Sequence, residues 1–127
     1  MKLLLLSGSV RKGSSNEATL RTVQQVTADD VKATLYRGIG ALPHFNPDED
    51  QDPLPPPVVE LRAAIREADA LLVCTPEYAG DMPGSFKNLL DWTVGGGEIG
   101  GKAAAWVNVA AAGRGVGAHE TLRLVLG

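Results

Sequence analysis

Short, uninterrupted apolar runs alternate along this chain with segments in which apolar residues recur every three or four positions. The runs are Leu3–Leu6 and Ala70–Cys74; Ala103–Val109 is apolar apart from Asn108 and is expected to be a strand too, and Val31–Tyr36 has the alternating pattern of a further strand. Continuous apolar runs of this length are typical of strands that are buried on both faces of a parallel sheet. The resulting order, β-α-β-α-β-α-β-α, predicts an α/β fold: a doubly wound parallel sheet with helices on both faces.

The expected helices cover about Asn16–Thr27, Val58–Ala68, Phe86–Trp92 and a last segment that contains Leu122, Val125 and Leu126. Ser14 and Glu17 have the spacing of a capping box, so the first helix is expected to begin there. The least regular segment, Arg37–Pro57, holds six of the eight prolines. We expect it to be an ordered surface crossing and not a linker, because neither flank is large enough to fold alone. Residues 1–127 are therefore expected to form a single domain.

Charge and composition exclude several classes of protein. Twelve basic and fifteen acidic residues give a net charge of −3, which argues against a nucleic-acid surface. The opening apolar run stops after four leucines, whereas a secretory leader needs roughly seven apolar residues and a membrane span about 20. A single cysteine, Cys74, cannot form an internal disulfide. We expect a cytoplasmic protein with no membrane or nucleic-acid partner.

The first expected loop, Gly8–Asn16, has the chemistry of a phosphate site. The start of a helix attracts anions, and here Ser9, Ser14, Asn16 and Arg11 can all donate hydrogen bonds to one. The loop has no G-x-G-x-x-G, and Ser14 stands where a P-loop has its lysine. A monoester phosphate, such as that of flavin mononucleotide (FMN), suits it best. In the alternative interpretation, Ser14 is only a helix cap and Arg11 only a solvated charge.

Two other loops carry clustered glycines or prolines. In Thr75–Gly84, prolines fix the backbone, glycines let a flat ring approach it, and Tyr78 offers a planar contact. The alternative there is a tight turn with a half-buried tyrosine. Gly96–Lys102 reads G-x-x-x-x-G-K, but it precedes a strand and leads into no helix, so we do not expect it to bind phosphate.

Taken together, the first two loops resemble a known family. The patterns Gly-Ser-x-Arg-x-x-Ser-x-Asn and Pro-Glu-Tyr-x-Gly-x-x-Pro-Gly-x-x-Lys-Asn-x-x-Asp-Trp, starting at Gly8 and Pro76, are similar to those of the NADPH-dependent FMN reductases. These flavodoxin-like proteins include quinone, azo-dye and chromate reductases. The resemblance covers essentially the whole chain, and it implies a flavodoxin-like sheet of strand order 2-1-3-4.

The resemblance also implies which residues hold the cofactor. Ser9, Arg11, Ser14 and Asn16 match the loop that holds the FMN phosphate, and Pro76, Glu77, Tyr78, Ala79 and Gly80 match the loop along the isoalloxazine ring. After the last expected strand we predict a glycine-containing turn, Ala110–Gly117, and its residues Ala111, Ala112 and Gly113 fall where a third loop of the family closes over the ring. Two departures remove side-chain contacts: the family usually has Asn at position 79, and many members have Ser-Pro-Gly in the third loop.

The implied activity is that of an NAD(P)H-dependent reductase, in which hydride passes from NADPH or NADH to FMN and electrons then pass to a quinone, flavin, azo compound or metal oxyanion. No side chain need act as acid or base, so no catalytic residue is expected. No metal site is expected either, since His44 and His119 lie in unrelated segments. The alternatives are a non-enzymatic FMN-binding electron carrier or sensor, and a chain that binds no flavin. A receiver domain is excluded, because it needs acidic residues where Ser7–Ser9 and Thr75–Pro76 stand.

Relatives usually continue into a fifth strand and a last helix, so the resemblance implies either a shortened member or an incomplete sequence. Without a fifth strand, Ala103–Val109 is an apolar edge with no charge or proline to discourage pairing. We therefore expect a protein of these 127 residues to associate, as a homodimer or homotetramer, or to be poorly soluble.

Overall fold

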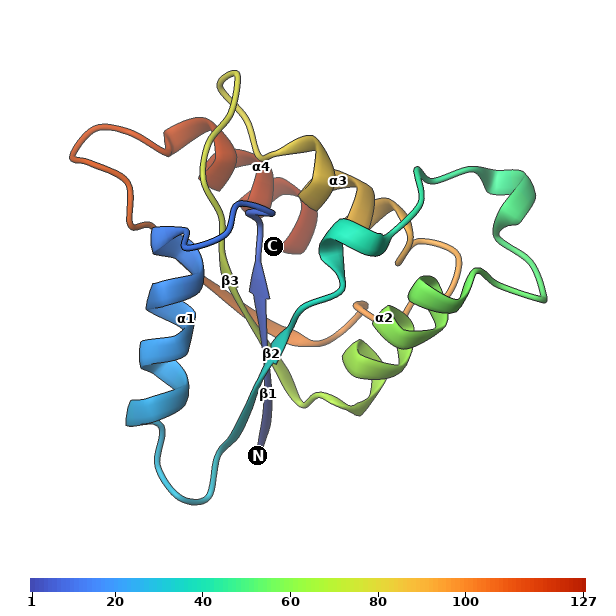
Figure 1. Cartoon of the computed structure of the whole chain (residues 1–127), viewed down its shortest axis with the longest axis horizontal. Coiled ribbons are helices and arrows are strands. Elements are labelled where there is room, and N and C mark those ends of the chain that lie inside the picture. The colour runs from blue at the N-terminus through green and yellow to red at the C-terminus, as the bar shows by residue number, and fades with distance from the viewer.

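The structure is a computed structural model that describes residues 1–127. Its centre is a parallel sheet of β1 (Lys2–Ser7), β2 (Lys32–Tyr36), β3 (Ala70–Cys74) and β4 (Ala103–Val107), in the order β2-β1-β3-β4 (Figure 1). The register pairs Leu5 with Leu35 on one side and with Leu72 on the other. The chain therefore reverses its direction of winding between β1 and β3. This order confirms the doubly wound, flavodoxin-like arrangement.

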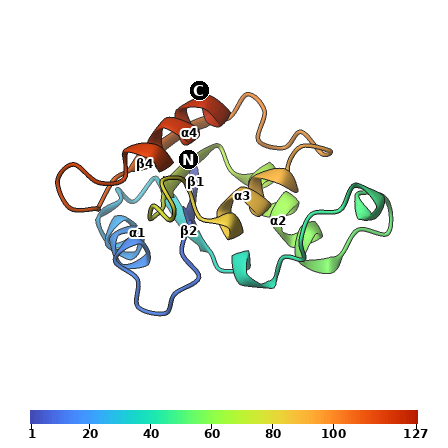
Figure 2. The ribbon, with the colours of Figure 1, turned by 90° about the horizontal axis from the view of Figure 1, so that it is seen from above.

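Helices cover both faces of the sheet, as the apolar pattern predicts. They are α1 (Ser15–Val26), α2 (Pro56–Glu67), α3 (Gly84–Asp91) and α4 (Val116–Leu126). Leu20 of α1 packs with Leu5 and Leu35 on one face, and α2, α3 and α4 share a larger core with Leu4 and Leu6 on the other. Figure 2 shows α1 separated from the other helices by the strands. No helix in the structure combines the length and apolar character needed to cross a membrane.

The first helix begins as predicted, but with half of a capping box. The Ser14 hydroxyl accepts a hydrogen bond from the Glu17 amide at 3.1 Å. The Glu17 carboxylate does not return this bond; it pairs with Arg21 and Arg37 instead. Ser14 alone therefore fixes the point where the chain leaves the first loop and enters α1.

Two predicted boundaries near β4 were wrong by two residues. The strand was expected to run to Val109 but ends at Val107, because the Asn108 side chain accepts a hydrogen bond from the Ala110 amide and turns the chain out of the sheet. The glycine-containing turn was expected to extend to Gly117, but α4 already begins at Val116.

The proline-rich segment is an ordered crossing, as predicted, with two short 3-10 turns at Ile39–Ala41 and Pro47–Glu49. The Pro43 carbonyl accepts hydrogen bonds from Trp92 at 2.8 Å and from Asn88 at 2.9 Å. Phe45 packs edge-on against Trp92, with 4.9 Å between ring centroids. Farther along, buried Arg62 of α2 pairs with Asp50 at 2.6 Å. These contacts anchor the crossing to α2 and α3.

Candidate functional site

Three loops meet at the carboxyl ends of the strands, where parallel sheets bind ligands. They are the first loop (residues 8–14), the second loop (residues 75–83) and the third loop (residues 108–115), at the upper left of Figure 1. A cleft of about 220 Å³ lies between them. Its lining consists of Ser15 and Asn16 at the start of α1, Thr75, Pro76 and Glu77 of the second loop, and Val109, Ala110, Arg114 and Gly115 around the third.

The first and second loops touch so closely that one position between them must be glycine. A Cβ atom on Gly8 would lie 2.0 Å from the Thr75 hydroxyl oxygen and 2.5 Å from the Thr75 Cβ atom. The Gly8 amide also donates to the Cys74 carbonyl at 2.9 Å, which continues the pairing of β1 and β3 past the end of the sheet. The base of the site is therefore rigid.

Hydroxyl groups organise the first loop from within. The Ser7 hydroxyl accepts from the Ser9 amide at 3.3 Å, and the Ser9 hydroxyl accepts from the Arg11 amide at 3.2 Å. Ser9 and Ser14 are buried and use their oxygens as acceptors toward the protein. A hydroxyl that accepts in this way still has its hydrogen to donate. Both serines can therefore donate to an anion placed on the loop.

Five consecutive backbone amides are available to bind such an anion. The N–H groups of residues 12–16 make no hydrogen bond of good geometry within the protein, and those of Ser15 and Asn16 open α1, where no earlier helical turn supplies acceptors. Unpaired amides at a helix start, together with the helix dipole, form an anion site. Arg11 is exposed beside these amides and makes no ion pair. Its charge is free to join a phosphate.

Asn16 is oriented by a partner that the sequence analysis missed. The Cys74 thiol donates to the Asn16 Oδ1 atom at 3.3 Å, and both residues are buried. This leaves the Nδ2 group of Asn16 as a donor. Burial raises the pKa of the Cys74 thiol to about 11, so the thiol stays protonated and keeps donating. The sequence places Cys74 at the end of an apolar run, and the structure gives it a polar contact as well.

The second loop ends in a tight hairpin tip. Tyr78 and Asp81 exchange two backbone hydrogen bonds, at 2.8 and 3.1 Å. Ala79 and Gly80 between them have φ angles of 52° and 79°. Glycine and asparagine tolerate this left-handed conformation best. The Tyr78 side chain is 54% exposed, so a face of its ring is accessible to a ligand.

The Glu77 carboxylate bonds to the start of α4. Its Oε2 atom accepts from the Gly117 amide at 2.8 Å and from the Ala118 amide at 3.4 Å, at the start of α4. Asp81 lies near α4 as well: its neighbour Thr121, followed by a hydrogen bond from the Met82 amide, lowers the pKa of the Asp81 carboxyl. The contribution of Glu77 to a bound ring is therefore expected from its backbone.

The third loop is shaped by Asn108, which the sequence analysis did not single out. The Asn108 amide group donates to the Arg114 carbonyl at 2.9 Å, and its oxygen accepts from Ala110. Gly113 and Gly115 have φ angles of 77° and 83°. Arg114 lines the cleft beside the start of α1 and was also missed. Like Arg11, Arg114 is a lone arginine in a glycine-containing loop that follows a strand, so the sequence does carry a signal for it.

The structure thus distributes the expected site residues over the three loops and the first turn of α1. Asn16, Pro76 and Glu77 line the cleft itself. The first loop and its helix cap contain Ser9, Arg11 and Ser14. The exposed tip of the second loop is formed by Tyr78, Ala79 and Gly80, and the third loop exposes Ala111 and Gly113.

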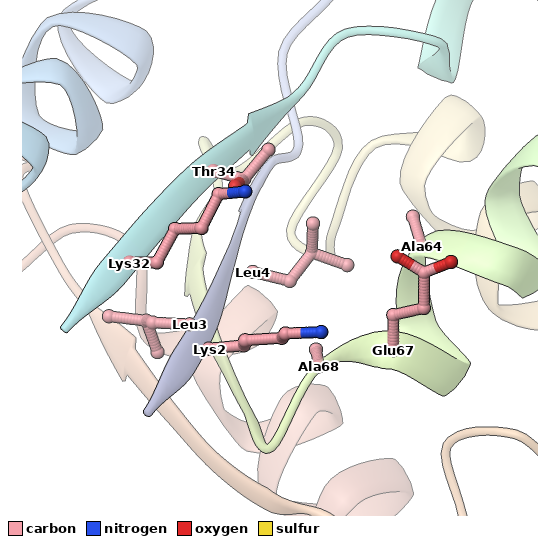
Figure 3. Close-up of a pocket in the computed structure, with 8 residues that line it drawn as sticks. All are labelled: Lys2, Leu3, Leu4, Lys32, Thr34, Ala64, Glu67 and Ala68. Atoms are coloured by element: carbon pink, nitrogen blue, oxygen red, sulfur yellow. The ribbon is translucent and has the colours of Figure 1, made fainter.

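Two other features lie outside this site. Lys102, the lysine of the G-x-x-x-x-G-K pattern, donates to the Ala68 carbonyl at 2.6 Å, just beyond the end of α2. A hollow of about 150 Å³ opens at the amino ends of β1 and β2, with Lys2, Lys32 and Thr34 facing Glu67 of α2 across an apolar floor (Figure 3). It lies at the end of the sheet opposite the three loops.

Comparison with known proteins identifies the family of this chain. The family model described as NADPH-dependent FMN reductase matches residues 1–127. The chain belongs to this family. A quinone reductase of Escherichia coli K12 is 34% identical over 93 residues, which cover 72% of this chain and 50% of that protein. An NAD(P)H-dependent FMN reductase of Pseudomonas aeruginosa is 40% identical over 92 residues, which cover 72% of this chain and 49% of that protein.

The structural similarity extends further along the chain. The FerB flavoenzyme from Paracoccus denitrificans, an NAD(P)H:acceptor oxidoreductase, superposes with a TM-score of 0.88 and 32% identity. The superposition covers 98% of this chain and 70% of FerB. The chain spans about half the length of the curated relatives that it matches.

Proposed function

We propose that residues 1–127 form an FMN-binding domain of an NAD(P)H-dependent reductase that acts on quinone-type small molecules. The observation that carries the proposal is the donor set of the first loop: five unpaired amides, the Ser9 and Ser14 hydroxyls and the free charge of Arg11. These groups suit a dianionic monoester phosphate, which accepts several hydrogen bonds and gains from the helix dipole. The names of the family and of its quinone-reducing relatives support the redox activity.

In this proposal the residues of the chain bind and orient the cofactor. The first loop and the start of α1 hold the phosphate, with the Nδ2 group of Asn16 as an additional donor. The backbones of Pro76 to Gly80 and of the third loop lie along the ring, where main-chain N–H and C=O groups can meet its polar edge. When bound, FMN supplies the redox chemistry, which is hydride acceptance from a nicotinamide and electron delivery to a second substrate.

The proposal includes the cellular compartment and the oligomeric state of the protein. A chain whose only cysteine is a buried thiol fits a reducing compartment, and we place it in the cytoplasm. The strand β4 is an edge of the sheet with the sequence Ala-Ala-Ala-Trp-Val, which favours association. We therefore propose a homodimer or homotetramer.

Fluorescence titration tests the cofactor, and NADPH or NADH oxidation with benzoquinone tests the activity. We expect FMN to bind more tightly than riboflavin, because only FMN carries the phosphate, and we expect oxidation of the nicotinamide to depend on bound FMN. Failure to bind FMN would overturn the proposal. FMN binding without nicotinamide oxidation would instead support the alternative, a non-enzymatic electron carrier or sensor.

A further inference from the structure

The helix α4 begins without a cap of its own. Its N-cap position is Gly115, which has a φ of 83° and no side chain to accept a hydrogen bond. The first amides of any helix have no partner within the helix, and they are normally satisfied by a Ser, Thr, Asp or Asn at the N-cap. This helix therefore needs an acceptor from elsewhere in the chain.

Glu77 supplies that acceptor from 40 residues away. Its Oε2 atom takes hydrogen bonds from the Gly117 amide at 2.8 Å and from the Ala118 amide at 3.4 Å. A negative charge at this end of a helix also gains from the helix dipole. One oxygen of the carboxylate is thus committed to α4.

The backbone of the second loop is pressed against the same turn of the helix. A Cβ atom on Gly117 would lie 1.8 Å from the Gly80 carbonyl oxygen, so this approach requires glycine. One turn further on, the Thr121 side chain lies close enough to Asp81 to help lower the pKa of its carboxyl. The second loop therefore rests on the first two turns of α4, from Glu77 through Asp81.

The third loop ends where α4 begins. Its last residues, Arg114 and Gly115, line the cleft together with Glu77. Any contact that fixes the second loop to the start of α4 therefore also fixes the distance between the two walls of the cleft. Glu77 is the one side chain that makes this connection at the cleft itself.

We propose that Glu77 is a positioning residue that joins the second and third loops into one preorganised unit, with a carboxylate that caps α4 and does not touch the flavin. This inference rests on the proposed function for the identity of the ligand. Loops that are already joined do not have to be ordered when the ligand binds, so the connection increases affinity for the ring. This gain in affinity does not depend on the phosphate, so it applies equally to FMN and riboflavin.

The test compares Glu77→Ala and Glu77→Gln with Glu120→Ala, which removes an exposed carboxylate from the same helix. Hydrogen exchange is measured on the flavin-free proteins. We expect Glu77→Ala to speed exchange about ten-fold or more both at residues 117–118 and at the Tyr78–Asp81 tip, because a bond to a charged acceptor is lost. Glu77→Gln keeps a neutral acceptor and is expected to be intermediate, and Glu120→Ala to match the parent.

Affinities for FMN and riboflavin provide the second readout. Glu77→Ala should weaken both by the same factor, about ten-fold, and Glu77→Gln should restore part of the loss. Faster exchange confined to residues 117–118 would reduce Glu77 to a local cap and overturn the inference. Affinity loss with unchanged exchange would show direct contact with the flavin, and a loss for FMN alone would show a role at the phosphate. If the parent binds neither flavin, the proposed function fails, while the exchange data still decide whether Glu77 joins the loops. If Glu77→Ala does not fold, Glu77→Gln carries both comparisons.

Discussion

Ala79 occupies a backbone conformation that costs an L-residue free energy. Its φ of 52° makes it the one non-glycine residue in the chain with a positive φ, and its side chain is exposed. The left-handed region costs about 1–2 kcal/mol for a residue with a Cβ atom, and asparagine escapes part of this cost through local hydrogen bonds. We therefore expect Ala79→Asn to raise the free energy of unfolding by about 0.5–1 kcal/mol.

Two further substitutions at the same position make the reasoning quantitative. Ala79→Gly removes the strain but adds about 0.5–1 kcal/mol of backbone entropy to the unfolded chain, so the net gain should be smaller than that of Ala79→Asn. Ala79→Val adds a branched side chain to the left-handed conformation and should lower stability by about 1 kcal/mol or more. Because the position is exposed, packing changes do not obscure this order.

Urea unfolding of the flavin-free protein, followed by circular dichroism, measures these differences. Thermal unfolding should show a rise of about 2–5 °C for Ala79→Asn, from the usual relation between stability and melting temperature in a chain of this size. The order expected is Asn, then Gly, then Ala, then Val. Equal stability of all four proteins, or a Val variant at least as stable as the parent, would refute the idea that the tip of the second loop stores backbone strain.

Four more outcomes are expected. Arg11→Ala should weaken FMN binding about ten- to a hundred-fold in fluorescence titrations, because a charge-assisted bond to the phosphate is worth roughly 1.5–3 kcal/mol. Riboflavin binding should stay unchanged. Equal losses for both ligands would mean that Arg11 only supports the loop. Gly8→Ala should lower the urea midpoint by the equivalent of about 1–3 kcal/mol, since its Cβ atom would meet Thr75, and an unchanged midpoint would contradict that contact. Burial raises the pKa of Cys74 from 9.0 to about 11, so the unfolded chain releases this proton at a lower pH than the folded protein does. Stability should therefore fall between pH 9 and pH 11. Cys74→Ala should flatten that part of the stability profile, and an unchanged slope would contradict the prediction. A protein of these 127 residues should be dimeric or larger by light scattering, because β4 offers an unpaired apolar edge, and a soluble monomer at high concentration would refute this.

The sequence by itself determined the sheet and the position of the ligand loops. Continuous apolar runs such as Ala70–Cys74 and the helical spacing of Val58, Leu61 and Ile65 are local patterns, and the structure reproduces them within two residues. The Ser14 cap is also local, since its acceptor and donor lie three residues apart. The paired loop motifs identified the family because each spans a short, continuous segment. Information of this kind can be read from a single chain.

Only the tertiary structure decided what the polar side chains of these loops contact. Glu77 caps α4 across 40 residues, and Cys74 orients Asn16 across 58. Neither pairing has a periodic signal, because each depends on how two separate loops pack against the ends of the strands. The family resemblance placed Glu77 along the ring, and the apolar run Ala70–Cys74 placed Cys74 in a buried strand. The fold instead uses both residues to hold the site together, because a buried helix start and a buried amide each need a hydrogen-bond partner that the local chain does not supply.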